Sequence, residues 1–264
     1  MLKLCVAGVL GRMGVAIVQE AFSKGIQTVG AIESSSSPAV GKTLRNLGIS
    51  EQDTEILSSD QLVNALSNAD VFVSFTCPTA ELTNIPIVAS QKKRIILGTT
   101  GFTSEQNLAI VDAIDGKVPA VFSPNYSVGV NIFYKLIDTL KAFPQNYDFS
   151  INEIHHTGKN DAPSGTAKKL GEIVSNIRNY TKTVTGRDGM SPRQPNEMEI
   201  TSLRVGGVSG IHSLTVAGPH EMLRIEHTAF SRCVLAQGAV HAAEWLSKQN
   251  TPKIYSMADV LSLT

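Results

Sequence analysis

Two adjacent histidines and a lysine lie in one short segment, EIHHTGKNDAPSGTAKKL, at residues 153–170. A histidine with a pKa near its usual value of about 6.5 and a lysine can together supply protons at neutral pH. Lys159 comes four residues after His155, and Gly158 allows the chain to turn the lysine back toward the histidine. The segment could therefore contain a catalytic acid. Chance association of ordinary side chains is the alternative.

The same segment indicates a place where an anion could bind. Ser164 precedes a helical pattern and is suited to be its N-cap. If it caps the helix, the backbone N–H groups of Gly165 and Thr166 stay free at the positive helix end, which favours a carboxylate. No histidine or carboxylate lies at zinc-ligand spacing, so we expect no metal.

A second motif, VAGVLGRMG at residues 6–14, follows a predicted strand and opens a predicted helix. Its glycines form G-x-x-G-x-x-G. Gly8 suits the tight turn, Gly11 allows the backbone to approach a pyrophosphate, and Gly14 permits close helix packing. Arg12 adds a positive charge. The motif predicts dinucleotide binding, with a merely structural turn as the alternative.

Glu33 lies at the end of the second predicted strand, 25 residues after Gly8. A carboxylate there can accept hydrogen bonds from a ribose diol. Ser34 follows instead of an arginine, so no cation is placed for a 2′-phosphate. We therefore predict that NADH works at least as well as NADPH.

Two further loops follow predicted strands, Phe75-Thr76 and Gly98-Thr99-Thr100-Gly101. Ligands of open parallel sheets bind at the carboxyl ends of the strands, and small residues there let a nicotinamide lie against the backbone. For each loop alone, an ordinary turn is the alternative.

The first 125 residues alternate short apolar runs with amphipathic segments. We predict strands at 4–8, 28–32, 71–75, 94–98 and 119–122, and helices at 11–22, 60–66 and 104–114. This alternation predicts an α/β domain with a parallel sheet covered on both faces.

The pattern changes after Asn125. We predict helices at 127–143, 164–180 and 231–246, and strand-like runs at 148–156, 199–208, 212–218 and 222–230. Grouped strands predict a separate α+β domain with a largely antiparallel sheet. The last helix is expected to pack back on the first domain.

Composition narrows the function classes. Lys+Arg and Asp+Glu number 23 each in 264 residues, so no basic surplus indicates nucleic-acid binding. Cys5, Cys77 and Cys233 lack metal-ligand spacing and suit free thiols in a reducing cytoplasm. No apolar run approaches the ~18 residues of a membrane span. We expect a cytoplasmic protein with no membrane partner.

The segment EIHHTGKNDAPSGTA resembles the signature of the 4-hydroxy-tetrahydrodipicolinate reductase (dihydrodipicolinate reductase) family. Nearly the whole chain shares the resemblance, because further segments match the family in the family's order: VAGVLGRMG, DVFVSFTCP, LGTTGF, SPNYSVGVN, RVGGVSG and IEHTAFSR. The histidine signature is specific, whereas the glycine motif is not.

The resemblance implies a Rossmann-type dinucleotide-binding domain at 1–126 and 232–264. A central α+β domain at 127–231, with a mixed, largely antiparallel sheet, would bind substrate and build a homotetramer. The implied reaction is hydride transfer from NADH or NADPH to carbon 4 of a cyclic dicarboxylate. Its product is tetrahydrodipicolinate, in lysine and diaminopimelate biosynthesis.

The resemblance also implies residue roles. His155 would be the proton donor and acceptor, and Lys159 a second proton donor. The implied substrate-binding residues are His156, Ser164, Gly165 and Thr166. The implied cofactor-binding residues are Gly8, Val9, Leu10, Gly11, Arg12, Met13, Glu33, Phe75, Gly98, Thr99, Thr100, Ser123, Pro124, Asn125 and Tyr126.

The chain departs from the family pattern at a few positions. Ser34 replaces an arginine found in some members, which bears on cofactor choice. Ile211 stands where the family usually has glutamate. We interpret 210–212 as a loop of the central domain, so this departure bears on assembly or on the order of that loop. Val9 and Leu10 are larger than the small residues often found there.

Two other functions fit parts of the sequence. One is another small Rossmann reductase, acting on a sugar or an amino acid, although the Glu-Lys-Pro of sugar oxidoreductases is absent after the fifth strand. The other is a dinucleotide-sensing regulator without turnover, which would need neither the histidine–lysine pair nor the carboxylate site.

Overall fold

The computed structural model of the protein describes residues 1–263. Thr264, the last residue of the predicted segment 232–264, lies outside the described residues. The chain forms two compact units, Met1–Val128 with Cys233–Thr264, and Gly129–Arg232. Within residues 1–263, no helix has the length and apolar character needed to cross a membrane.

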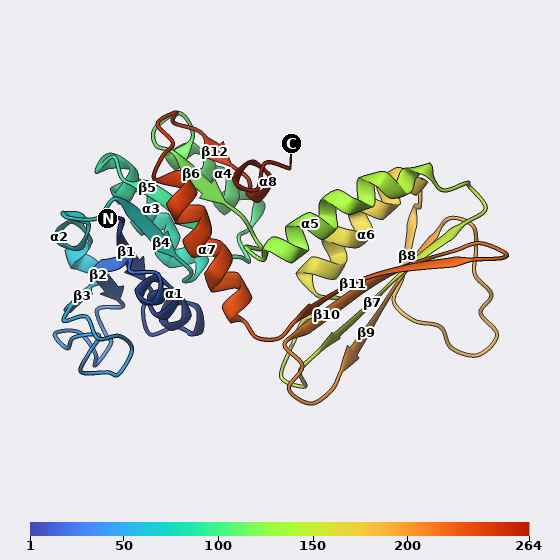
Figure 1. The fold of residues 1–264 in the computed structure, drawn as a ribbon, viewed down its shortest axis with the longest axis horizontal. Coiled ribbons are helices and arrows are strands. Elements are labelled where there is room, and N and C mark those ends of the chain that lie inside the picture. Colours follow the sequence, from blue (N-terminus) through green and yellow to red (C-terminus); the bar gives the residue numbers. More distant parts are fainter. Residues whose placement is uncertain (264) are drawn as a thin grey trace. The chain divides into compact units, whose positions relative to one another are not determined.

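The first unit is built on a seven-stranded sheet in which all neighbouring strands are parallel (Figure 1). The strand order is β12-β6-β5-β4-β1-β2-β3. The strands are β1 Lys3–Ala7, β2 Gln27–Glu33, β3 Ile56–Ser58, β4 Val71–Ser74, β5 Arg94–Leu97, β6 Ala120–Phe122 and β12 Ile254–Tyr255. The strands predicted from the sequence are present. The sequence did not reveal β3 and β12, because runs of two or three residues show no readable periodicity.

Helices cover both faces of this sheet. They are α1 Arg12–Ser23, α2 Leu62–Leu66 with the 3₁₀ turn η1 Ser59–Gln61, α3 Pro78–Ser90, α4 Ser104–Ile114, α7 Cys233–Leu246 and α8 Met257–Val260. Leu4 and Val6 of β1 pack in the core shared with α1 and α7, whereas Cys5 and Ala7 pack in the core shared with α2, α3 and α4. Alternate residues of a strand point to opposite faces, so the continuous apolar run of β1 serves both cores. The predicted α/β Rossmann-type architecture is confirmed, and so is the return of the C-terminal helix to this unit.

The topology places the loops of interest at one edge. Strand order reverses between β1, which continues to β2 and β3, and β4, which continues to β5 and β6. The carboxyl ends of parallel strands share an edge, and ligands of such sheets bind where the order reverses. The loops after β1, β4 and β5 therefore lie at the expected binding edge.

The second unit contains a five-stranded sheet of order β11-β10-β7-β9-β8, with two helices along one face (Figure 1). Its elements are α5 Val128–Ile137, the 3₁₀ turn η2 Asp138–Ala142, β7 Asp148–His155, α6 Gly165–Arg178, β8 Lys182–Val184, β9 Glu197–Arg204, β10 Gly210–Ala217 and β11 Met222–Ala229. Phe149 and Ile151 of β7 pack against Leu170 and Val174 of α6, which makes a third core.

The strand directions correct one expectation. The strand β10 pairs antiparallel with β7 and β11, whereas β9 pairs parallel with β7 and β8. The predicted mixed sheet is confirmed, but "largely antiparallel" is wrong, because half of the pairs are parallel. The helix α6 carries the chain back after β7, so the next strands enter in the same direction as β7.

The predicted helix 127–143 is also shorter than expected. The α-helix ends at Ile137 and continues as a 3₁₀ turn to Ala142. Phe143 is already extended, with ψ 139°. Pro144 follows it, and a residue before proline is driven away from the helical region.

Candidate active site

A buried carboxylate holds the first histidine of the signature. His155 is the last residue of β7 and is 8% exposed. Its Nδ1 is hydrogen-bonded to Oε2 of Glu153, which lies two residues earlier on the same face of the strand. The other oxygen of Glu153 accepts from Arg204 Nη2 at 2.9 Å and from the Ser164 backbone N–H at 3.2 Å. Glu153 therefore connects the histidine, the neighbouring strand β9 and the start of α6.

The protonation states follow from this arrangement. Burial raises the pKa of Glu153, but hydrogen bonds from Arg204 and His155 outweigh burial, so the pKa is lowered and the carboxylate is ionised at neutral pH. Burial lowers the pKa of His155; Glu153 opposes this, whereas Lys159 and Arg204 lower the pKa further. An ionised carboxylate can only accept, so Nδ1 of His155 carries a proton and Nε2 is the atom left to exchange one.

The start of α6 is built as the sequence predicts. Ser164 is the N-cap, and its Oγ accepts the Ala167 N–H at 3.2 Å. Gly165 is exposed in the first turn, and Thr166 is half-buried with its side chain hydrogen-bonded to Tyr134. The backbone amides of Gly165 and Thr166 lie in this first turn, where the positive end of the helix dipole favours an anion.

A third histidine, which sequence reasoning did not single out, lies beside this N-cap. His212 of β10 is opposite Glu153 in the strand register, and its Nε2 is 3.0 Å from Ser164 Oγ. Because Ser164 Oγ accepts from Ala167, its own proton is available to His212 Nε2, which leaves His212 protonated at Nδ1. Within the described residues this Nδ1 is buried without a hydrogen-bond partner.

The three side chains also meet the geometry of a loose metal cluster. Glu153, His155 and His212 each offer a ligand atom, and these atoms lie within 4.8 Å of one another. Sequence spacing could not reveal this group, because its members come from two strands. Both oxygens of Glu153 are already used by donors, one of them a guanidinium that repels a cation. We therefore interpret the group as a hydrogen-bonded acid and not as a ligand set.

The turn after β7 brings the lysine near the site. The Lys159 N–H donates to the His156 carbonyl at 3.1 Å, and Lys159 Nζ donates to Asp161 Oδ1 at 2.7 Å. This hydrogen bond is the main cause of the lowered pKa of Asp161. Nothing in the sequence had marked Asp161 as the partner of Lys159. His156 is half-buried.

The lowered pKa of the buried His212 predicts how the stability of the protein changes with pH. Burial is the main cause that lowers the pKa of His212 from 6.5 to about 4; His155, His227 and Lys159 also lower it, and Glu153 opposes them. Between these pH values the unfolded chain binds the extra proton and the native protein does not, so the free energy of unfolding falls as pH falls. The full shift corresponds to about 3 kcal/mol.

We expect the native protein to lose about 3 kcal/mol more stability between pH 7 and pH 4 than the His212→Asn variant does, in urea unfolding at each pH. Equal losses in both proteins would contradict the assignment of a neutral, buried His212.

The glycine motif forms a tight turn, as predicted. Gly8 has φ +67°, and a Cβ on Gly14 would lie 2.1 Å from the Gly8 carbonyl oxygen. The N–H groups of Gly8 and Val9 both donate to Ile32 O, and that of Gly11 donates to Gly8 O. These amides are therefore occupied. The amides that helix geometry leaves free for an anion are those of the first turn of α1, beginning at Arg12.

Glu33 lies beside the glycine turn. It is the last residue of β2, and its Oε1 accepts the Leu10 N–H at 2.7 Å while its Oε2 accepts the Ser34 N–H at 3.3 Å. Val9 is fully buried in the core, and Leu10 is 38% exposed. The larger side chains at these two positions thus point into the core or into solvent.

The other predicted cofactor loops pack on one another. The ring of Phe75 lies so close to Gly98 that a Cβ there would be 2.0 Å from it, and it contacts the Tyr126 ring at 5.4 Å between centroids. The Tyr126 hydroxyl donates to the carbonyls of Leu97 and Val121, and the side chain is 1% exposed. Tyr126 is thus a core residue. Ser123 donates to the Asn125 carbonyl at 2.9 Å and shapes the loop after β6.

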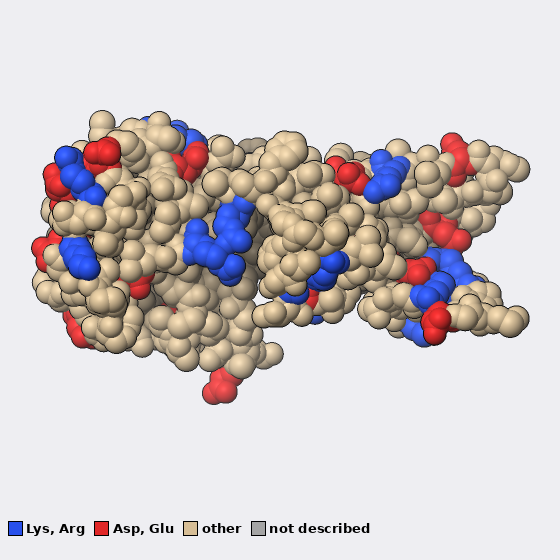
Figure 2. All heavy atoms as spheres, turned by 90° about the horizontal axis from the view of Figure 1, so that it is seen from below, with Lys and Arg blue, Asp and Glu red and all other residues tan. Residues whose placement is uncertain are grey.

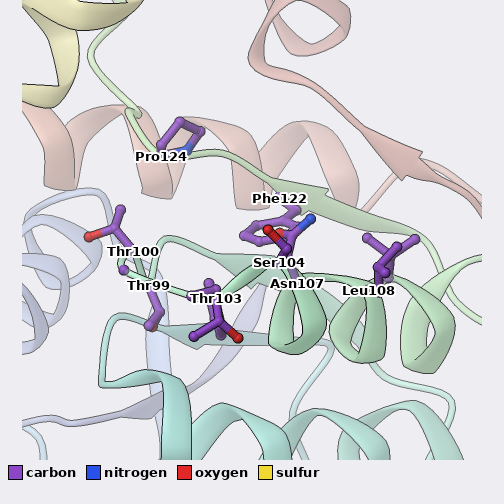
Figure 3. A pocket seen from close by; sticks show the side chains of 11 residues that line it. Thr99, Thr100, Thr103, Ser104, Asn107, Leu108, Phe122 and Pro124 are labelled. Carbon is purple, nitrogen blue, oxygen red and sulfur yellow. The ribbon is translucent and has the colours of Figure 1, made fainter.

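A pocket of about 730 Å³ opens beside these loops (Figure 3). Predicted residues Thr99, Thr100 and Pro124 line it. Gly101 of the same predicted loop also lines it. Residues that sequence reasoning missed complete the lining: Phe102, Thr103, Ser104, Asn107, Leu108, Val111 and Phe122. They belong to the segment before α4, to α4 and to β6, none of which carried a recognisable binding motif. Figure 3 shows Thr100 and Pro124 at one end and Leu108 at the other.

Charges are dispersed on the surface. Figure 2 shows basic and acidic side chains in small groups separated by uncharged surface on the face that it presents. This agrees with the equal numbers of basic and acidic residues, 23 each. Attraction of an anion must come from local groups such as Lys159, Arg204 and the first turn of α6.

A Rossmann-type sheet with a glycine turn at its binding edge, joined in one chain to a unit in which a buried carboxylate holds a histidine, is typical of an oxidoreductase that uses a nicotinamide cofactor. Family models agree with this class. The model for the dihydrodipicolinate reductase N-terminus matches residues 2–126, and that for the C-terminus matches residues 129–261. The chain belongs to the dihydrodipicolinate reductase family.

Individual relatives support this membership. Proteins named 4-hydroxy-tetrahydrodipicolinate reductase from Methanosarcina barkeri and Methanosarcina acetivorans are 42% and 41% identical to this chain, with 100% of both chains covered in each case. The structure of a dipicolinate-bound dihydrodipicolinate reductase from Paenisporosarcina sp. TG-14 superimposes with a TM-score of 0.75 at 20% identity, covering 98% of each chain. The protein is therefore an oxidoreductase, and the alternative of a dinucleotide-sensing regulator without turnover is excluded.

Proposed function

We propose that this enzyme reduces 4-hydroxy-tetrahydrodipicolinate to tetrahydrodipicolinate with a nicotinamide cofactor, a step of lysine and diaminopimelate biosynthesis. The observation that carries the proposal is the pairing of the His155 imidazole with Glu153, next to the positive N-terminal end of α6. A sugar reductase would have no use for this arrangement, because a neutral sugar has no carboxylate for the helix end to bind.

The substrate is a ring with two carboxylates, and the second unit, residues 127–231 in the sequence-based division, offers the groups to hold it. The amides of Gly165 and Thr166 bind one carboxylate at the positive end of α6. His156 and Lys159 lie on the turn that precedes this helix, and Ser164 sets its first turn. The Paenisporosarcina reductase binds dipicolinate, which is also a ring dicarboxylate, and this supports the ligand class.

His155 acts as the acid. When bound, the reduced nicotinamide would supply a hydride to carbon 4 of the ring, and the 4-hydroxyl group would leave the substrate as water. A dianion bound beside His155 raises the pKa of the buried imidazole, because a nearby negative charge favours the charged form. Glu153 stabilises that form at Nδ1, and Nε2 then delivers its proton to the enamine carbon that hydride addition leaves. Lys159 serves as a second proton donor.

The cofactor lies along the edge formed by the loops after β1, β2, β4, β5 and β6. The first turn of α1, with Arg12 and Met13, receives the pyrophosphate, and Glu33 binds the ribose diol. The nicotinamide half lies near Phe75, Gly98, Thr99 and Thr100. The loop Ser123–Tyr126 contributes backbone and the Pro124 surface.

We expect kcat/KM with NADH to be at least as high as with NADPH, because the 2′-phosphate would meet the Glu33 carboxylate and find Ser34 instead of a cation. Steady-state rates with both cofactors check this. The Ser34→Arg variant is expected to raise kcat/KM for NADPH. A preference of the native enzyme for NADPH of about a hundredfold would contradict the inference.

We propose that the same unit builds the homotetramer that the resemblance implies. One sheet face is covered by α5 and α6, and on the other face the register places Ile211, Ile154 and Leu203 in one row, with Leu203 52% exposed. Ile211, at the position where the family usually has glutamate, lies on strand β10 and not in the predicted loop 210–212, and it adds to this apolar row. Burying it between copies is favourable. We propose the cytoplasm as the location of the protein, which suits the exposed thiol of Cys77.

The test is steady-state oxidation of NADH, followed by absorbance, with the substrate generated enzymatically. Turnover that depends on the cyclic dicarboxylate supports the proposal. Turnover with sugars or amino acids, and none with this substrate, would overturn it.

A further inference from the structure

A buried carboxylate lies beneath the proposed cofactor loops and has no place in the functions assigned above. Glu81 belongs to the first turn of α3 and is fully buried. Its Oε1 accepts three hydroxyl groups, those of Ser74 at 2.6 Å, Thr76 at 2.6 Å and Thr99 at 2.5 Å. Within the described residues, its Oε2 is buried without a hydrogen-bond partner.

The three hydroxyls come from two neighbouring strands. Ser74 ends β4 and Thr76 follows it, whereas Thr99 lies just beyond the end of β5. The Thr76 N–H also donates to Thr99 Oγ1 at 2.9 Å. A hydroxyl has a single proton to donate, and here all three protons are committed to one oxygen, so the rotamers of all three side chains are set by Glu81.

These contacts reach the glycine turn as well. A Cβ on Gly8 would lie 2.8 Å from Thr76 Cγ2, so the Thr76 methyl group lies directly against the turn after β1. Phe75, the neighbour of Thr76, packs its ring on Gly98. The loops after β1, β4 and β5 therefore meet around two threonines that one carboxylate holds.

Thr99 is 3% exposed and Thr76 is half-buried, so their hydroxyls point inward and do not bind a ligand. At the edge of the sheet, Thr76 and Thr99 present their backbone. A carboxylate that fixes their side chains therefore also fixes the position of that backbone. Positioning of this kind matters strongly, because a misplacement of about 1 Å in a binding site can cost about a hundredfold in rate.

We propose that Glu81 is a positioning residue for cofactor binding, which holds the loops after β1, β4 and β5 in the arrangement that receives the nicotinamide half of the cofactor. This inference rests on the cofactor contacts proposed above for these loops. Glu81 itself touches neither cofactor nor substrate, since its side chain is fully buried.

The test compares Glu81→Ala and Glu81→Gln in the full-length enzyme. For Glu81→Ala the Kd of NADH, measured by nicotinamide fluorescence without substrate, is expected to rise about tenfold or more, while the KM of the dicarboxylate stays within about twofold. Glu81→Gln keeps one oxygen to accept the three hydroxyls, so its Kd is expected to stay within about threefold of the native value.

Ile85→Ala is the matched control, because Ile85 is fully buried on the same helix and has no polar atom that could accept the three hydroxyls. It should lower the melting temperature and leave the Kd of NADH unchanged. If Glu81→Ala does not fold, Thr99→Val removes one donor with little change in volume, and a rise in Kd of about threefold is expected. A rise in Kd for Ile85→Ala equal to that for Glu81→Ala would overturn the proposal, as would an unchanged Kd in a folded Glu81→Ala or Thr99→Val.

A further variant separates this inference from the loop assignment. Thr100 is exposed and lines the pocket, so Thr100→Phe tests the loop after β5 without disturbing the core. If Thr100→Phe weakens NADH binding and Glu81→Ala does not, the positioning role falls and the loop assignment stands. If neither variant weakens binding, the loop assignment falls and the positioning role falls with it.

Discussion

Replacing His155 by glutamine is expected to lower kcat by about 10²–10⁴-fold, which is the usual contribution of a positioned general acid. Glutamine has similar reach and can still hydrogen-bond to Glu153, so the fold and the neighbouring Arg204 interaction should be retained. The Kd of NADH should not change, because the proposed cofactor contacts come from the other unit. Stopped-flow single-turnover rates and fluorescence titration of NADH measure the two quantities.

His220→Gln is the control for this experiment. His220 is exposed in the turn between β10 and β11 and should not affect either quantity. Normal turnover by His155→Gln would mean that another group delivers the proton, and the acid assignment would be wrong. A loss of NADH binding by the same variant would show that the substitution acts beyond the acid.

Replacing Glu153 by alanine is expected to have the second large effect, on both activity and stability. The substitution removes the acceptor of His155 Nδ1, of Arg204 and of the Ser164 N–H at once. Removing one partner of a buried ion pair costs about 3–5 kcal/mol, and the partial exposure of Arg204, 19%, places this site at the lower end. We expect a loss of about 3 kcal/mol in urea unfolding and a fall in kcat of at least about tenfold, because the imidazole is no longer oriented.

Glu199→Ala provides the comparison. Glu199 lies on β9 of the same sheet and pairs with Arg187 at 3.1 Å, away from the histidines. Such a partly exposed pair contributes about 1 kcal/mol or less, and kcat should not change. The conservative Glu153→Gln variant should recover most of the stability but not kcat, because an amide cannot stabilise a protonated imidazole as a carboxylate does. Equal effects of Glu153→Ala and Glu199→Ala would refute the special role of Glu153.

Patterns among nearby residues were sufficient to predict much of the fold of this molecule. The alternation of apolar runs and amphipathic segments predicted the parallel sheet and its helices, because both periodicities are local properties of the chain. The N-cap at Ser164, the turn at Gly8 and the placing of Glu33 at the end of β2 were also readable, since each depends on a few consecutive residues. The resemblance to the reductase family rested on equally short segments.

Other features depended on which strands become neighbours. Arg204 lies 51 residues beyond Glu153 along the chain and His212 lies still further on, and only the pairing of β7 with β9 and β10 brings them to His155. The parallel direction of β9, the hydrogen bonds of Glu81 to two strands and the burial of Tyr126 have the same origin. Contacts between distant segments are set by sheet register and core packing, which minimise the free energy of the whole fold and leave no local mark. The residues proposed to do the chemistry were thus visible in the chain, whereas the residues that contact and orient them became visible only once the strands were side by side.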